Sequence, residues 1–233
     1  MRIGVLGTGN MADALATHWA RAGHEVVIGG RDLAKAERLA SRIGEGAKPA
    51  GLRAAAEFGQ VVLAALPFGV VTDAVRQLRT ELTGTVLLDC TNPLGEGFRL
   101  LTDGGRSGAQ QIAAAAPEAQ VVKAFNLCHE DVWRMRPPVF DGRPLAVPIC
   151  GDDEEALARV RELVRDAGCE PLNGGGLDRA GLVEATAALF IALWVEQRAD
   201  AQAIAPPLAY AAGPGRERAV DGEAGRGGDV SDE

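Results

Sequence analysis

The sequence has few aromatic residues and no excess of basic charge. Only 4% of its 233 residues are Phe, Trp or Tyr, so a platform on which several nucleobases stack is not expected. Its 24 Lys and Arg residues are outnumbered by 32 Asp and Glu residues, which gives a net charge of −8. A protein that binds nucleic acid needs a basic face for the phosphates, and this balance argues against such a partner. A local basic site for a phosphorylated small molecule is compatible with it.

Cysteine is also scarce. The four cysteines, Cys90, Cys128, Cys150 and Cys169, are far apart and form no CxxC pair. This spacing supplies neither the ligand set of a structural zinc site nor a disulfide framework. We therefore expect no metal, and reduced thiols that are mostly buried.

Long hydrophobic runs are missing as well. The longest, residues 185–195, lies between Glu184 and Glu196, whereas a transmembrane helix needs about 20 apolar residues. Met1 leads almost directly into a strand-like run at residues 3–6, and we expect no signal peptide before it. These features predict a soluble, cytoplasmic protein with no membrane partner.

Short apolar runs alternate with amphipathic helical patterns along most of the chain. The runs are rich in Val, Ile and Leu with little alternation, which is typical of parallel strands covered by helices on both faces. The expected fold class is therefore α/β: a doubly wound Rossmann-type parallel sheet with a small C-terminal α-rich unit and a disordered tail. Strands are predicted over residues 3–6, 25–28, 61–66, 85–89, 121–125 and 145–150, and helices over residues 11–22, 33–43, 70–78 and 110–116.

Composition divides the chain into three segments. We predict a Rossmann domain over residues 1–128, a smaller C-terminal α/β unit over 129–205, and a Pro/Gly-rich tail over 206–233, disordered from about 212. In the second unit, Asp152 or Asp153 is expected to cap a helix that runs to about residue 167. A flexible turn at 173–176 and a long helix over 177–203 are predicted to follow. Because three turns of this helix are apolar all round, we expect it to be buried in a homodimer interface.

The strongest motif begins the first predicted helix. The segment GTGNMA at residues 7–12 has the form G-x-G-x-x-A and follows a predicted strand. Gly7 permits a tight turn, Gly9 lets the backbone approach a pyrophosphate, and Ala12 allows close packing of helix on strand. A helix N-terminus offers free N–H groups to phosphates, so we predict a dinucleotide site rather than a ligand-free turn. Its predicted residues are Gly7, Thr8, Gly9, Asn10 and Met11.

The end of the second strand indicates which dinucleotide binds. An NAD site has Asp or Glu there to accept from the ribose 2′-hydroxyl, whereas this chain has Gly30 and Arg31. Arg31 can bind a 2′-phosphate through two parallel hydrogen bonds. Lys35, one helical turn later, can add a second positive charge. We therefore predict that NADP(H) binds here; the alternative is that both cations are solvated surface residues.

The ligand of a doubly wound sheet lies beyond the carboxyl ends of its strands. Leu66 and Pro67 end the strand predicted at residues 61–66 and are predicted to contact the cofactor. Asn126 ends a later strand and is our candidate for the catalytic polar contact, although it could instead close a turn. The loop over residues 94–107 could form a flap. On the substrate side we predict Asn92, Leu127 and Cys128.

Five segments carry a resemblance to a known family. The runs MRIGVLGTGNMA, GGRD, KAFN, CGDDEEA and LVEATAALFIALW occur in this order at familiar separations. Together they resemble the NADPH-dependent coenzyme F420 reductases, also called F420-dependent NADP oxidoreductases, over about residues 1–200. The resemblance implies an oxidoreductase that transfers a hydride between NADPH and the deazaflavin coenzyme F420, its co-substrate.

The resemblance also implies where the two rings lie. The deazaflavin would stack on the nicotinamide near Pro67, Asn126 and Leu127. A hydride passes directly between two carbon atoms, so placing two flat rings in contact is the main requirement. The lack of an obvious nucleophile, triad or metal set is consistent with this reaction.

Some positions depart from the family pattern on the substrate side. Leu127 stands where the family has Thr, Asn173 where it has Asp, and Gly181 where it has Arg, with Arg179 two residues earlier. The acceptor therefore stays open. The alternatives are an NADPH-dependent reductase of a small imine or carbonyl compound and a non-catalytic NADP(H)-binding sensor.

The three histidines differ in their predicted roles. His18 and His24 fall within and just after the first helix, and both are expected to be structural. His129 is the one histidine close to Asn126 in the sequence. It could donate a proton, which imine or carbonyl reduction would need, or it could be an ordinary loop residue.

Overall fold

The computed structural model describes residues 1–102 and 105–205. The predicted disordered tail, 206–233, lies outside the described residues. Two residues of the predicted flap, 103 and 104, lie outside them as well.

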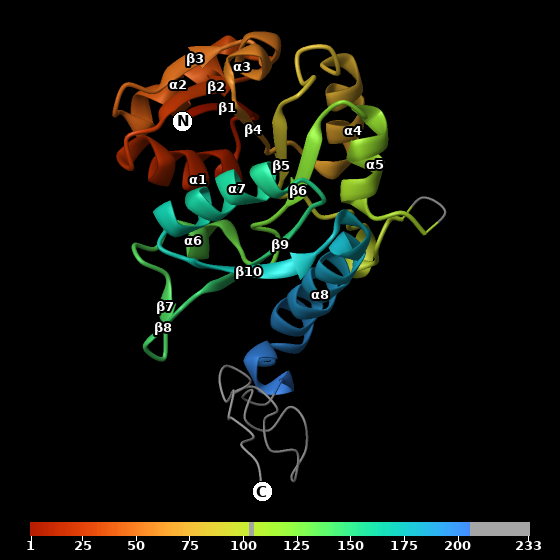
Figure 1. Ribbon diagram of the computed structural model, residues 1–233. Helices are drawn as coiled ribbons and strands as arrows, with labels where there is room; N and C mark the ends of the chain where they lie inside the picture. The colour runs from red at the N-terminus through yellow and green to blue at the C-terminus, as the bar shows by residue number, and fades with distance from the viewer. Residues whose placement is uncertain (103–104, 206–233) are drawn as a thin grey trace, which may run out of the picture.

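A sheet of eight strands forms the centre of the protein, in the order β10-β9-β6-β5-β4-β1-β2-β3 (Figure 1). The part from β3 to β6 is parallel throughout and has the strand order 3-2-1-4-5-6 of a doubly wound dinucleotide-binding sheet. The predicted Rossmann-type fold is thus confirmed. The strands are β1 (Arg2–Leu6), β2 (Glu25–Gly29), β3 (Lys48–Ala50), β4 (Val61–Ala64), β5 (Val86–Asp89), β6 (Gln120–Lys123), β9 (Ala146–Cys150) and β10 (Glu170–Gly175).

Helices cover both faces of this sheet, and each face has its own apolar core. One core contains residues of α1, α2 and α7, and the other contains residues of α3, α4, α5 and α8. This arrangement explains the continuous apolar strands, since both of their faces are buried. The helices are α1 (Asn10–Arg21), α2 (Leu33–Ile43), α3 (Leu52–Phe58), α4 (Phe68–Gln77), α5 (Gly108–Ala115), α6 (Glu130–Trp133), α7 (Glu154–Asp166) and α8 (Ala180–Ala192).

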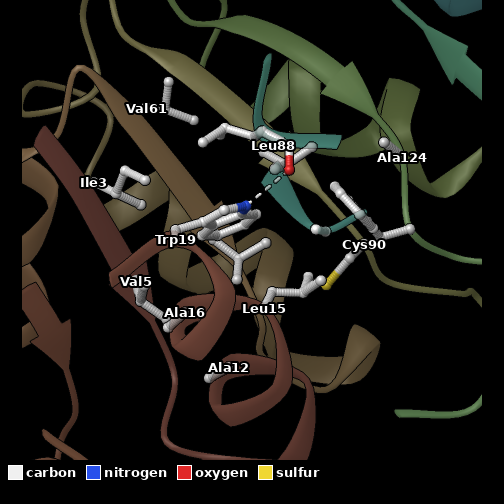
Figure 2. Packing of buried hydrophobic residues seen from close by; sticks show 14 of the residues in the cluster. Ile3, Val5, Ala12, Leu15, Ala16, Trp19, Val61, Leu88, Cys90 and Ala124 are labelled. Atoms are coloured by element: carbon white, nitrogen blue, oxygen red, sulfur yellow. Dashed lines mark hydrogen bonds between the residues drawn. The ribbon is translucent and has the colours of Figure 1, made fainter. Parts of the chain in front are cut away.

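Trp19 joins segments that are far apart in the sequence inside the first core. Its ring packs with Ile3, Leu15 and neighbouring apolar side chains, and its Nε1 donates to the carbonyl oxygen of Leu163 in α7 at 3.0 Å (Figure 2). Strands β9 and β10 likewise extend the sheet of the N-terminal segment, because Cys150 pairs antiparallel with Lys123. The sheet and the core thus continue across the predicted boundary at residue 128. The division into units 1–128 and 129–205 remains a prediction from the sequence.

Capping residues fix the start of three helices. Asp32 accepts from the backbone N–H of Lys35 at the start of α2, and Asp153 accepts from that of Ala156 at the start of α7. Ser107 and Gln110 form a capping box at α5. Satisfying these free N–H groups defines where each helix begins, and the predicted Asp153 cap is confirmed.

Two predictions for the C-terminal segment are wrong. The predicted flexible turn at 173–176 is largely strand: Asn173, Gly174 and Gly175 belong to β10, which runs parallel to β9. A Cβ on Gly174 would lie 2.6 Å from Cys150 Sγ, so glycine here permits close strand contact rather than flexibility. The predicted helix over 177–203 is also too long. A 3₁₀ turn precedes α8, a π-helical segment follows it, and Arg198 ends the helix in a left-handed conformation with φ of 52°.

Sequence patterns missed several short elements. These are strand β3, helices α3 and α6, and the hairpin of β7 (Val139–Phe140) and β8 (Arg143–Pro144). The predicted flap contains a 3₁₀ turn at Glu96–Phe98 and a bridge between Leu94 and Leu100, and this turn contacts α8.

Helix α8 extends away from the layered core, and much of its apolar surface is exposed (Figure 1). By length and composition alone, the stretch Leu177–Gln197 could cross a membrane, although a single such helix is weak evidence for that. Only 17% of its most apolar window is buried. Core packing therefore does not explain its composition, contrary to the usual behaviour of an apolar helix in a soluble domain.

Candidate active site

A tight turn after β1 forms the nucleotide side of the candidate site. Gly7 has φ of 128°, and a Cβ there would lie 2.2 Å from the carbonyl oxygen of Ala65, so a side chain cannot be accommodated. Gly9 precedes the first residue of α1, and a Cβ there would meet no atom within 4 Å. The helix N-terminus therefore opens onto free space beside a backbone that a ligand can approach, as the G-x-G-x-x-A motif predicts.

The end of β2 lies against this turn. A Cβ on Gly30 would be 3.0 Å from the Thr8 methyl group, which brings the two segments into contact. Arg31 and Lys35 follow Gly30 in the sequence, and both are exposed. The Asp32 carboxylate between them in sequence is bound to the N-terminus of α2, where it caps the helix.

The other predicted cofactor residues border the same turn. A Cβ on Gly7 would lie 3.5 Å from the Leu66 side chain, and Pro67 is exposed at the start of α4. Met11 is half-buried against the first core. Asn10 Nδ2 donates to Glu130 Oε1 at 2.7 Å, which connects the turn to α6. All ten predicted cofactor residues thus lie at the carboxyl ends of β1, β2 and β4 or in the segments that follow.

Asn92 and Asn126 form a side-chain pair across the ends of β5 and β6. Asn92 Nδ2 donates to the carbonyl oxygen of Asn126 at 2.7 Å, and Asn126 Nδ2 donates to Asn92 Oδ1 at 2.9 Å. Asn126 Nδ2 also donates to the carbonyl oxygen of Val183 in α8 at 3.2 Å. Among the described residues the Oδ1 of Asn126 has no hydrogen-bond partner, although it is buried. The structure therefore joins two predicted site residues, and it ties both to α8.

The residue before Asn126 has an unusual backbone. Phe125 has φ of 59°, which is uncommon for a bulky residue and costs free energy. Its buried ring makes edge-on contacts with Trp19 and Trp133, at centroid distances of 6.1 and 5.3 Å. This packing stabilises the left-handed turn, and the turn in turn sets the direction of Asn126.

A buried charge network that the sequence analysis missed lies beneath this pair. Lys123 Nζ is 2.9 Å from Asp89 Oδ2 and 2.9 Å from Glu184 Oε1, and all three side chains are fully buried. Lys123 also donates to the carbonyl oxygen of Thr91. Burial alone would lower the pKa of Lys123, but the two carboxylates outweigh it and raise this pKa above that of an exposed lysine.

Glu184 extends this network to a further helix. Its two carboxylate oxygens accept from the backbone N–H groups of Gly108 at 2.8 Å and Ala109 at 3.0 Å. These are free donors at the N-terminus of α5, where a negative charge is stabilised. A sequence signal did exist, since Asp89 and Lys123 stand in otherwise apolar strands and Glu184 in an apolar helix.

A pocket of about 220 Å³ lies next to the asparagine pair. Leu127, predicted on the substrate side, is one of its walls. Cys128 is half-buried behind it, and burial raises the pKa of its thiol to about 11, which keeps the thiol neutral near pH 7. The pocket is lined by Leu127, Pro148, Gly174, Arg179, Leu182, Val183 and Thr186.

The positions that depart from the family pattern lie around this pocket or just beyond it. Asn173 is exposed in β10, and its Oδ1 accepts from the backbone N–H of Gly175 at 2.9 Å. Gly181 lies in the first turn of α8, and a Cβ there would make an ordinary 3.6 Å contact with Ser107.

His129 caps α6 with 67% of its side chain exposed, and it lies next to Glu130 and Asp131.

One group of side chains among the described residues could offer ligands to a metal ion. His24, Glu162 and Asp166 offer ligand atoms that all lie within 4.8 Å of one another. His24 is already paired on both ring nitrogens, with the Met1 amine at 2.8 Å and Asp166 at 2.9 Å. His18 is also buried, and its Nε2 lies 2.7 Å from the carbonyl oxygen of Trp133.

Comparison with known proteins assigns the family. The chain is 30% identical over 221 residues to the F420-dependent NADP reductase of Methanocaldococcus jannaschii, a match that covers 88% of this chain and 97% of that protein. The chain belongs to the F420-dependent NADP reductase family. Residues 2–93 also match the family model described as NADP oxidoreductase coenzyme F420-dependent. The resemblance stated from the sequence is confirmed.

Two other proteins are similar to this chain. The metalloreductase STEAP3 of Rattus norvegicus is 33% identical over 193 residues, which cover 83% of this chain but 38% of that protein. Among solved structures, an Arthrobacter sp. FB24 protein provisionally named an F420-dependent NADP reductase superposes with a TM-score of 0.76 at 26% identity. That match covers 85% of this chain and 95% of the other.

Proposed function

We propose that this protein transfers a hydride between NADPH and the deazaflavin coenzyme F420. The observation that carries the proposal is the 30% identity to an F420-dependent NADP reductase over 97% of that protein's length. The fold supports it, since the dinucleotide turn follows β1 and Asn126, beside the pocket, follows β6, at the same edge of one parallel sheet.

The residues on the nucleotide side fit NADP(H). The space beside Gly9 and the free N–H groups of α1 suit a pyrophosphate, with Thr8, Asn10 and Met11 around it. The exposed Arg31 and Lys35 supply positive charge for a 2′-phosphate. When bound, NADPH supplies the hydride. The side chains of Leu66 and Pro67 would border the nicotinamide.

On the acceptor side, the residues of this chain orient the acceptor ring and exclude water. They do not transfer protons. Asn126 is held by Asn92 and by Val183, so its amide has one fixed direction in which to contact a ring. Leu127 provides an apolar wall beside it. Holding two reactants in one geometry accounts for a large part of the rate of such transfers.

The experiment that tests this function is spectrophotometric. Purified protein, NADPH and oxidised coenzyme F420 are mixed, and the absorbance of the deazaflavin is followed, with NADH as the control. We expect bleaching with NADPH and little with NADH. An unchanged spectrum, with NADPH binding established separately, would reject F420 as the acceptor and leave a reductase of another compound or a sensor.

Replacing His129 by alanine is expected to change turnover less than twofold. His129 is largely exposed and pairs with carboxylates of its own helix, and direct hydride transfer needs no proton donor from it. Steady-state rates of the variant and of the native enzyme provide the check. A tenfold loss in kcat would favour reduction of an imine or carbonyl compound, which requires a proton donor.

We further propose a cytoplasmic homodimer formed through the C-terminal half of α8 and the residues after it. Leu189 is 52% exposed and Val195 63% exposed, and Trp194 packs against Phe190 beside them. Covering these side chains with a second copy would remove apolar surface from water. Light scattering that gives the mass of a single 24.2 kDa chain would exclude this dimer.

A further inference from the structure

The pocket beside Asn126 has one charged wall residue, Arg179. The guanidinium of Arg179 donates through Nε to the carbonyl oxygen of Gly174 at 3.0 Å. Among the described residues it has no carboxylate partner, whereas Arg134, Arg159 and Arg161 are each paired with Asp or Glu. An arginine at the edge of a pocket with free donors is suited to bind an anion.

The strand next to Arg179 is shaped around its side chain. Gly175 has φ of 97°, and a Cβ there would lie 2.3 Å from Arg179 Cδ. Only glycine therefore allows the arginine stem to lie against β10. The neighbouring Asp178 carboxylate is directed to the backbone of Gly176, where a Cβ would be 2.7 Å from its Oδ1. The cation is thus held in place before any ligand arrives, which lowers the entropy cost of binding.

The pocket admits part of a ligand. Its volume of about 220 Å³ corresponds to roughly seven water molecules, which suits one substituent of the acceptor better than a complete deazaflavin with its side chain. Val183 lines this pocket and accepts the hydrogen bond from Asn126, so the substituent would lie directly beside the proposed point of ring contact.

We propose that this pocket binds an anionic substituent of the hydride acceptor and that Arg179 is the residue that selects for it. The proposal rests on the proposed function in that the acceptor is expected to be coenzyme F420. The side chain of that coenzyme carries a phosphodiester and carboxylates, either of which an arginine can bind.

Kinetics with two acceptors test the role of Arg179. Coenzyme F420 is compared with the deazaflavin riboside that lacks the phosphodiester side chain. We expect Arg179→Gln to raise KM for F420 about tenfold, a loss typical of a charge-assisted hydrogen bond. The KM for the riboside and kcat for both acceptors should stay within twofold. The KM of Arg179→Lys for F420 should lie between those of the native protein and Arg179→Gln. Arg159→Gln, at a half-buried position of α7 outside the pocket, serves as the control. Equal changes with both acceptors, or none with F420, would overturn the proposal.

A binding measurement separates this proposal from the proposed function. Glutarate and inorganic phosphate are titrated against native protein and Arg179→Gln, both saturated with NADP⁺ so that the nucleotide site is filled. We expect one of the two anions to raise the melting temperature of the native protein by several degrees and that of the variant by less than one. This result without F420 turnover would reject F420 but keep an anionic acceptor. Equal behaviour of the two proteins toward both anions would reject the anion pocket.

Discussion

Replacing Arg31 by aspartate is expected to raise KM for NADPH about 100-fold and to change KM for NADH less than threefold. Arg31 is exposed after β2 beside the Gly7 turn, where a ribose 2′-phosphate would lie. The substitution removes two charge-assisted hydrogen bonds, and a loss of about 3 kcal/mol corresponds to two factors of ten. It also adds a negative charge that repels the phosphate. Steady-state kinetics with both nucleotides measures the effect.

The control for Arg31 is Arg38→Asp on α2, the helix that begins after Arg31. Arg38 is also exposed but lies seven positions further along the chain, and its replacement changes the net charge by the same amount. We expect a change in KM for NADPH of less than fivefold, since exposed charges at this distance are screened by salt. Equal weakening of NADPH and NADH by Arg31→Asp would contradict the assignment of the 2′-phosphate.

The second large effect concerns stability. Lys123→Met is expected to lower the free energy of unfolding by about 3–5 kcal/mol, because it leaves the buried carboxylates of Asp89 and Glu184 without their cation. For a chain of this size the melting temperature should fall by roughly 6–20 °C. Urea and thermal denaturation measure both quantities. Lys48→Met, at an exposed position of β3, is the control and should change stability by less than about 0.5 kcal/mol.

The pH dependence of this loss follows from the raised pKa of Lys123. A lysine whose pKa is higher in the folded state contributes its full stabilisation below the pKa of the unfolded chain, about 10.4. That contribution disappears as the pH rises through the folded pKa. Titration of Lys123 should therefore not change the difference in stability between native protein and Lys123→Met from pH 6 to 9. A loss smaller than 1 kcal/mol, or one that vanishes near pH 8, would contradict a charged lysine in this network.

The nucleotide half of the molecule was predictable because its signals are local. The turn at Gly7 and the strand ends each depend on residues that are neighbours in sequence. Spacing along the chain therefore carries their geometry. The same holds for the parallel strands, whose continuous apolar runs report burial on both faces.

Contacts between distant segments were not predictable in this way. In the sequence, Lys123 is a single cation within an apolar strand, and its partners Asp89 and Glu184 lie 34 and 61 positions away. Gly174 and Gly175 read as a flexible turn, yet the first faces Cys150 and the second faces Arg179. A glycine in the sequence indicates either a flexible backbone or a position with no space for a side chain. Tertiary contacts decide which of the two applies.

The position of the proposed acceptor pocket has a consequence for how this enzyme can diversify. All of its wall residues come from position 127 onward, while the nucleotide turn and its cations come from the first 67 residues. On this proposal, single substitutions among the wall residues in β10 and α8 would alter the choice of acceptor without changing a residue of the nucleotide turn. In such a family, the N-terminal nucleotide segment could stay unchanged in evolution while the C-terminal segment adapts to a new acceptor.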